Sequence, residues 1–146
     1  MRQFSLFDST TNRLSLIDRE IKAAMAAACK RFCDSHRVSR EEVVARMNAR
    51  AVEAGVRLTG GNAKELSDHI FAKWLSPSAP DHMPGIRALN VFMDVVGDLS
   101  PLSVQAAVHD GAVVSAEQLL LLERVEVENQ IKALQRRKKQ LEEAIR

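Results

Sequence analysis

The stretch that decides the fold is SREEVVARMNARAV, which occupies residues 39–52. Ser39 and Glu42 have the spacing of a capping box, in which the serine side chain accepts from the first backbone N–H groups and the glutamate reaches back. Gly55 is a plausible stop, because glycine adopts the conformation that ends many helices. The apolar positions that we expect to face inward are Val43, Val44, Met47 and Val52. We therefore expect a capped, amphipathic helix here.

Upstream of this stretch, apolar residues recur at three- and four-residue steps, which is the period of a helix with one buried face. The sequence predicts this helix from about Ser15 to Phe32. Its stripe consists of Leu14, Ile17, Ile21, Ala24, Met25, Ala28 and Phe32. Residues 1–14 lack such a period. They are expected to form an N-terminal arm, either flexible or docked on a neighbour through its three hydrophobes, Phe4, Leu6 and Phe7.

Downstream, a linker over residues 55–61 contains two adjacent glycines and marks a turn. A third helix is expected from Asn62, with Ser67 as an alternative start, and it ends before Pro77. Its expected apolar positions are Leu66, Ile70, Phe71, Trp74 and Leu75. Two further helices are expected over residues 84–96 and 100–109, because proline is well placed at the first turn of each. These elements define a helical domain over residues 15–112.

The C-terminal segment, residues 115–146, is predicted to be one long helix. It opens with a capping box at Ser115 and Gln118 and then contains no glycine or proline. Leucine or valine recurs every seven residues, as the seam of a coiled coil requires. The seam consists of Leu120, Val127, Leu134 and Leu141. The helix is expected to join subunits into oligomers. Only half of the companion positions are apolar, so whether it forms a coiled coil or packs on its own domain stays open.

The composition is that of an ordinary globular protein, and it favours an all-α fold. Hydrophobic residues make up 46% and charged residues 27%, while aromatic residues make up only 4%. A core of leucine, valine, isoleucine, alanine and methionine suits helices better than sheets. No membrane-length apolar run and no signal-peptide pattern is present, so a cytoplasmic location is expected. Cys29 and Cys33 are four residues apart on a helix, which favours buried, reduced thiols over a disulfide or a metal site.

The order of pieces between Ser39 and Val96 is similar to that of a helix-turn-helix domain. The pieces are the capped helix at Ser39, an amphipathic helix ending in Trp74-Leu75-Ser76-Pro77-Ser78, an apolar helix with Ile86 and Leu89, and the run Gly97-Asp98-Leu99-Ser100-Pro101-Leu102. In this order they resemble the lambda-repressor-like class and, more closely, small DNA-binding regulators of Mu-like transposable phages. The interval from Met47 to Leu66 is longer than a compact helix-turn-helix allows.

The resemblance implies a transcriptional regulator in a bacterial host cell that binds double-stranded DNA at early or transposition-related promoters. In such a protein the third helix would read DNA through the face that its apolar stripe leaves exposed. We expect Ser67, Asp68 and His69 to lie near the base edges. The residues expected toward the phosphate backbone are Lys64, Lys73, Arg40 and Arg57.

Two other interpretations stay open: a helical adaptor that grips a protein partner, and a protein that coats DNA without reading its sequence. The basic cluster Arg136-Arg137-Lys138-Lys139, with Lys132, lies among glutamates, which favours a solvated helix face over a phosphate contact. No nucleophile motif or phosphate-binding loop is present, and the four histidines lie in unrelated local contexts. We therefore expect no enzyme activity, no cofactor, no metal and no small-molecule substrate.

Overall fold

The computed structural model describes the backbone of residues 2–146 and the side chains of residues 11–146. The chain divides into two compact units, Met1–Ala112 and Val113–Arg146. The described residues form six helices and no strand: α1 (Arg2–His36), α2 (Arg40–Ala54), α3 (Asp68–Leu75), α4 (Ile86–Val96), α5 (Ser100–Val108) and α6 (Ala116–Ile145). The prediction of an all-α protein with about five helices and a long C-terminal helix is confirmed.

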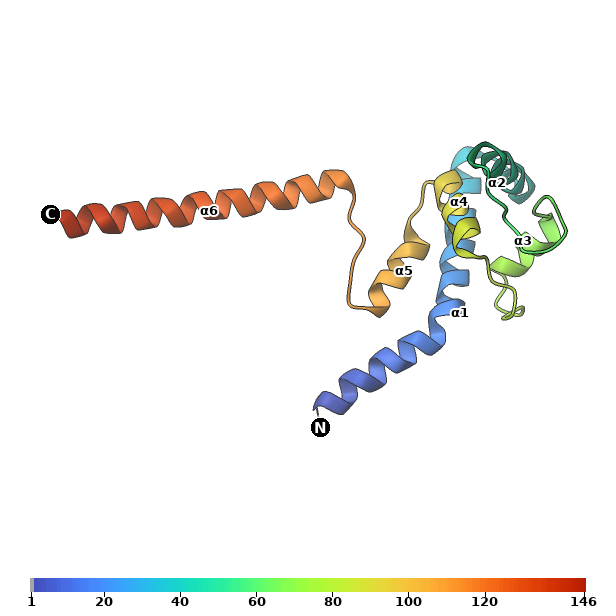
Figure 1. Ribbon diagram of the computed structural model, residues 1–146, viewed down its shortest axis with the longest axis horizontal. Coiled ribbons are helices and arrows are strands. Elements are labelled where there is room, and N and C mark those ends of the chain that lie inside the picture. Colours follow the sequence, from blue (N-terminus) through green and yellow to red (C-terminus); the bar gives the residue numbers. More distant parts are fainter. Residues whose placement is uncertain (1) are drawn as a thin grey trace. The chain divides into compact units, whose positions relative to one another are not determined.

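The first unit is built around α1. Helices α2, α3, α4 and α5 each contact α1, and α2 also contacts α3 and α4 (Figure 1). The connections α1–α2 and α4–α5 each take three residues, 37–39 and 97–99, whereas α2 and α3 are joined by the loop 55–67. The long interval from Met47 to Leu66 therefore consists of the end of α2 and most of this loop.

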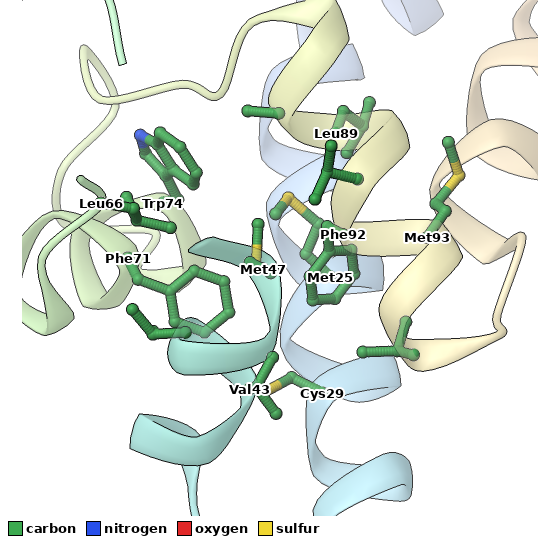
Figure 2. Packing of buried hydrophobic residues seen from close by; sticks show 14 of the residues in the cluster. Met25, Cys29, Val43, Met47, Leu66, Phe71, Trp74, Leu89, Phe92 and Met93 are labelled. Atoms are coloured by element: carbon green, nitrogen blue, oxygen red, sulfur yellow. The ribbon is translucent and has the colours of Figure 1, made fainter. Parts of the chain in front are cut away.

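The core lies where α1, α2, α3 and α4 meet, and their side chains point toward one another in Figure 2. The rings of Phe71 on α3 and Phe92 on α4 have their centroids 6.0 Å apart, and both residues are fully buried. Trp74 meets Phe71 edge-on at 6.4 Å. Three methionines, Met25, Met47 and Met93, belong to the same buried cluster, where flexible, unbranched side chains fill irregular spaces. The labelled members of the cluster are Met25, Cys29, Val43, Met47, Leu66, Phe71, Trp74, Leu89, Phe92 and Met93.

The cap of α6 follows the sequence, and that of α2 does so in part, because the Glu42 carboxylate accepts from Arg46 and makes no capping-box bond to the Ser39 N–H. The Ser39 side chain accepts from the N–H of Glu42 at 3.2 Å, and Gly55 ends α2 with a left-handed φ of 66°. At α6 the capping box is complete, because Ser115 accepts from the Gln118 N–H and Gln118 accepts from the Ser115 N–H. Within α2, Val43, Val44 and Met47 are buried as predicted. Val52 was placed wrongly: it is 78% exposed, and Ala51 continues the buried face four residues after Met47.

The start of α1 differs from the prediction. The helix begins at Arg2, so residues 2–14 are not a separate, non-helical arm. No glycine or proline interrupts this stretch, and the helix therefore continues through its weak formers. Near the end of this stretch, Arg13 donates to the carbonyl of Ala107, in the last turn of α5, and to Asp110, just after α5, at 2.7 Å. The arm's hydrophobes Phe4, Leu6 and Phe7 lie outside the residues whose side chains are described.

Two further helix starts are corrected. Helix α3 begins at Asp68 and not at Asn62, so the alternative start at Ser67 is the right one. Helix α4 begins at Ile86, after Gly85, and not at Pro84. Side-chain hydrogen bonds hold the segment before α3 as a loop: Arg57 donates to the carbonyls of Gly61 and Ala63. Such local bonds compete with helix formation.

Candidate nucleic-acid interface

Helix α3 is the element on which the predicted DNA contacts depend. It has eight residues, too few for a stable helix in isolation. Phe71, Trp74 and Leu75 are buried, as the apolar period predicted, while Ser67, Asp68 and His69 at its start are exposed. Ser67 is the N-cap, and its side chain accepts from the N–H of Ile70 at 3.2 Å. The helix therefore presents a polar N-terminal end above a buried apolar face.

The N-terminal end of α3 is tied to α2 by Asn48. Its side-chain amide makes two hydrogen bonds to the backbone of Leu66, donating to the carbonyl at 2.9 Å and accepting from the N–H at 2.8 Å. Leu66 itself is buried, so these bonds satisfy peptide groups that are partly shielded from water. The sequence analysis missed this residue. An asparagine in the middle of a helix is a weak helix former, and that was the only signal.

The C-terminal end of α3 is tied to α1 by Lys22, which is only 2% exposed. Its ammonium group donates to the carbonyl oxygens of Lys73 at 2.8 Å, Ser76 at 3.3 Å and Ala79 at 2.7 Å, and also to that of His82. These carbonyls belong to the last turn of α3 and to the loop after it. One buried cation thus organises the loop that the sequence marks only by its serines and prolines.

The charge of Lys22 is set by opposing influences. Burial lowers the pKa of its amine from the ordinary value, and the nearby Asp18 carboxylate raises it. The carbonyl oxygens also favour the ammonium form, because hydrogen bonds to the charged form stabilise it. The sequence held one signal: Lys22 falls between Ile21 and Met25 on the stripe that faces the core. A lysine there needs buried partners.

The predicted contact residues divide between separate surfaces. Ser67 and Asp68 line a groove between α2 and the start of α3, together with Glu41, Asn48 and Glu65. Three of these five side chains are carboxylic acids, and the groove contains no lysine or arginine. Lys64, His69 and Arg40 are exposed, and Lys73 is half-buried, but none of the four lines this groove.

Arg57 lies in a second groove, with Arg87 at the start of α4. The first turn of α4 has no side-chain cap, because its N-cap residue is Gly85. Uncapped N–H groups at a helix start and two guanidinium groups both attract anions. Arg87 was missed by the sequence analysis, which weighed no basic residue in the helix that follows α3.

The two cysteines are free thiols. Cys29 is buried and Cys33 half-buried. Burial, followed by the neighbouring Cys33, raises the pKa of Cys29 to about 12, so its thiol is neutral at physiological pH. Among the residues whose side chains are described, no three histidine, cysteine or acidic side chains gather as a metal site would require.

Helix α6 has a different character, since none of its residues is buried within the described chain. Every residue of the predicted seam is exposed: Leu120 and Leu134 are each 66% exposed, and Val127 and Leu141 are each 53% exposed. No helix in the described part of the chain is long and apolar enough to cross a membrane. Comparison of the chain with protein-family models, with curated proteins and with solved structures finds no match.

Proposed function

We propose that this protein is a phage-type transcriptional regulator that binds double-stranded DNA as an oligomer in the cytoplasm of a bacterial host. In this proposal α3 enters the major groove, and α6 joins the subunits. The early or transposition-related promoters of a Mu-like phage are the proposed targets, on the resemblance of residues 39–102.

The observation that carries the proposal is the fixation of α3 at both ends. Asn48 holds the backbone just before the helix, and Lys22 holds the carbonyl groups at its end. A helix that reads DNA has to present its side chains in one orientation, because contacts to base edges depend on geometry. The exposed residues of the first turn, Asp68 and His69, are then available to the bases, as the N-terminal residues of a recognition helix are.

Phosphate contacts would come from basic residues around this helix. Lys64 precedes α3, and Lys73 lies on its last turn. Arg57 and Arg87 add the second groove, where the uncapped start of α4 favours a phosphate group. Arg40 begins α2 and is exposed. These contacts set the position of the protein on the duplex, and the base contacts supply the specificity.

The charge balance favours sequence-specific DNA binding over non-specific coating. Acidic and basic residues are nearly equal in number over the first unit, and carboxylates line the groove beside Ser67. Non-specific coating depends on phosphate neutralisation, so it favours a strongly basic surface. The same carboxylates favour a basic peptide as the partner under the alternative of a helical adaptor.

The test is a binding titration of the purified protein against labelled DNA from upstream of its own gene and against scrambled DNA, at several salt concentrations. Tight binding to the first fragment that persists at moderate salt is expected. Equal, salt-sensitive binding to both fragments would indicate coating. A folded protein that binds neither would contradict the DNA proposal and favour the adaptor.

Variants sharpen this titration. His69→Ala with Lys73→Ala should weaken specific binding by about 10- to 100-fold, since each contact contributes roughly 1–2 kcal/mol. Ser67 is left intact because it caps α3. Lys30→Ala with Arg19→Ala is the matched control, because both residues are exposed on α1. Equal losses in the two double variants would show that α3 is not the reading element.

A further inference from the structure

Charge is segregated along α6. The acidic residues of the first half are Glu117, Glu123, Glu126 and Glu128, and the basic residues of the second half are Lys132, Arg136, Arg137, Lys138 and Lys139. Arg124 in the first half and Glu142 with Glu143 in the second half are the exceptions. All these side chains lie on an exposed helix. Two such helices attract each other when the acidic half of one lies along the basic half of the other.

We propose that α6 pairs with α6 of a second copy of this chain in an antiparallel two-stranded coiled coil. The inference rests on the self-association proposed above and adds its direction and register. In this pair the exposed seam of Leu120, Val127, Leu134 and Leu141 packs against the same seam of a second chain.

The seam itself favours the antiparallel direction. Its companion positions are Arg124, Ile131, Lys138 and Ile145, and in a parallel pair each residue meets its own copy. Arg124 would face Arg124, and Lys138 would face Lys138, so two layers of the seam would hold only like charges. In the antiparallel pair each companion residue meets a leucine or valine of the other chain. Every layer then contains at least one aliphatic side chain.

The register follows from the overlap of the two helices. With Arg124 at the level of the second copy's Leu141, the next layers pair Ile131 with Leu134, Lys138 with Val127, and Ile145 with Leu120. This register overlaps the two helices from about residue 119 to the end of the chain. The stems of Arg124 and Lys138 cover the facing aliphatic groups, while their charged ends reach the flank of the coil.

The flanking charges complement each other in this register. Within one helix, Arg124 pairs with Glu128 at 3.0 Å, and Lys138 pairs with Glu142 at 3.8 Å. The antiparallel pair places Arg124 beside the second copy's Glu142, and Glu128 beside its Lys138. Four alternating charges then form a network, which the twofold symmetry repeats. A parallel pair would instead place Glu123 beside Glu128 of the other chain.

The antiparallel direction has a consequence for DNA binding. The two chains enter the coil from opposite ends, and their α6 N-termini are about 50 Å apart at 1.5 Å per residue. A parallel pair would bring both entry points to one end. The antiparallel coil thus suits half-sites separated by one or more turns of DNA, about 34–36 Å each.

The test exchanges charges without changing composition. One variant carries Arg124→Glu with Glu128→Arg, and the other carries Lys138→Glu with Glu142→Lys. Each retains its opposite charges at i and i+4 within the helix. In an antiparallel homodimer of either variant all four cross-chain pairs become repulsive, and the dissociation constant is expected to rise roughly 100-fold. Mixed together, the two variants regain every attraction, so they should form a heterodimer close to wild-type affinity.

Sedimentation equilibrium of the full chains, one of them carrying a fluorescent label, measures all of these constants. The matched control exchanges Arg136→Glu with Glu143→Arg, which lie on the outward face of the proposed coil, and it should dimerise like wild type. Homodimers as tight as wild type in both variants, or no gain on mixing, would overturn the antiparallel proposal. A monomeric wild-type chain would overturn both self-association and its direction. Loss of DNA binding alone, with the expected dimer pattern, would contradict only the DNA proposal.

Discussion

Helices α3 and α6 differ in length and in what surrounds them. Helix α3 has eight residues, and three of them, Phe71, Trp74 and Leu75, are buried. Helix α6 has 30 residues, and none of them is buried by the part of the chain that the structure describes. Two polar side chains, the buried Lys22 and the half-buried Asn48, hold the ends of α3. A capping box and ion pairs between neighbouring turns support α6.

The difference shows two ways in which a helix can be specified. Backbone hydrogen bonds and capping suffice for a long helix without glycine or proline, so α6 can form before anything covers it. A helix as short as α3 depends on tertiary contacts, and its position is set by the residues that supply them. We therefore expect substitutions around α3 to change folding stability, and substitutions on the seam of α6 to change association.

The largest effect on stability should come from Lys22→Met. It removes the donor shared by the carbonyls of Lys73, Ser76, Ala79 and His82. Leaving these groups without a partner should lower the free energy of unfolding by about 4 kcal/mol. Urea unfolding measures the change, and Lys30→Met on the exposed side of α1 is the control. A loss below about 1 kcal/mol would mean that α3 and the loop after it do not depend on the hydrogen bonds of Lys22.

On α6, Leu134→Asp should weaken self-association by about 100-fold or more, because it places two charges in adjacent layers of the proposed seam. The free energy of unfolding of the first unit should change by less than about 0.5 kcal/mol, as for other exposed substitutions. Sedimentation equilibrium and urea unfolding separate the two effects. Ala133→Asp, which adds the same charge off the seam, should leave the dimer intact. Equal association of the two variants would mean that the seam is not the contact.

Asn48→Ala tests the other end of α3. The variant loses both hydrogen bonds to Leu66, and we expect the free energy of unfolding to fall by about 2 kcal/mol. The matched control is Asn90→Ala in α4, where the exposed side chain bonds only to the carbonyl of Ile86 in its own helix. If both variants lost a similar free energy of unfolding, Asn48 would contribute no more to stability than an ordinary surface amide.

The apolar period was enough to predict most helices and much of the core. Met25, Phe71 and Trp74 follow the period of their helices and are buried as expected. Start signals at Ser39 and Ser115 also worked, because the capping serine and its partner are local in sequence. The start of α3 needed more. Asn62 and Ser67 can both cap a helix. Hydrogen bonds from Asn48 to Leu66, and from Arg57 to the carbonyls of Gly61 and Ala63, hold the backbone before Ser67 as a loop, so the helix begins after Ser67.

The arrangement around α3 could not be obtained from local patterns. Lys22 lies 51 residues before Lys73, the first of the residues whose carbonyl groups it bonds, and no local sequence pattern indicates those partners. Arg87 joins Arg57 in one groove only because the loop after α2 passes the start of α4. Local composition predicted which face of α3 is polar, since that depends on the helical period alone. It could not predict the acidic groove, which combines α2 with the segment before α3.

The smallest expected effect compares the caps of the two helices directly. Ser67 and Ser115 make the same bond to the N–H three residues on, at 3.2 Å and 3.1 Å. Ser67→Ala should lower the free energy of unfolding of the first unit by about 1 kcal/mol, because α3 folds as part of its core. Ser115→Ala should leave that value unchanged and only increase fraying, seen as faster amide exchange over residues 116–119. If both substitutions destabilised the first unit equally, α6 would have to be coupled to its folding. The contrast between a packed short helix and an independent long one would then fail.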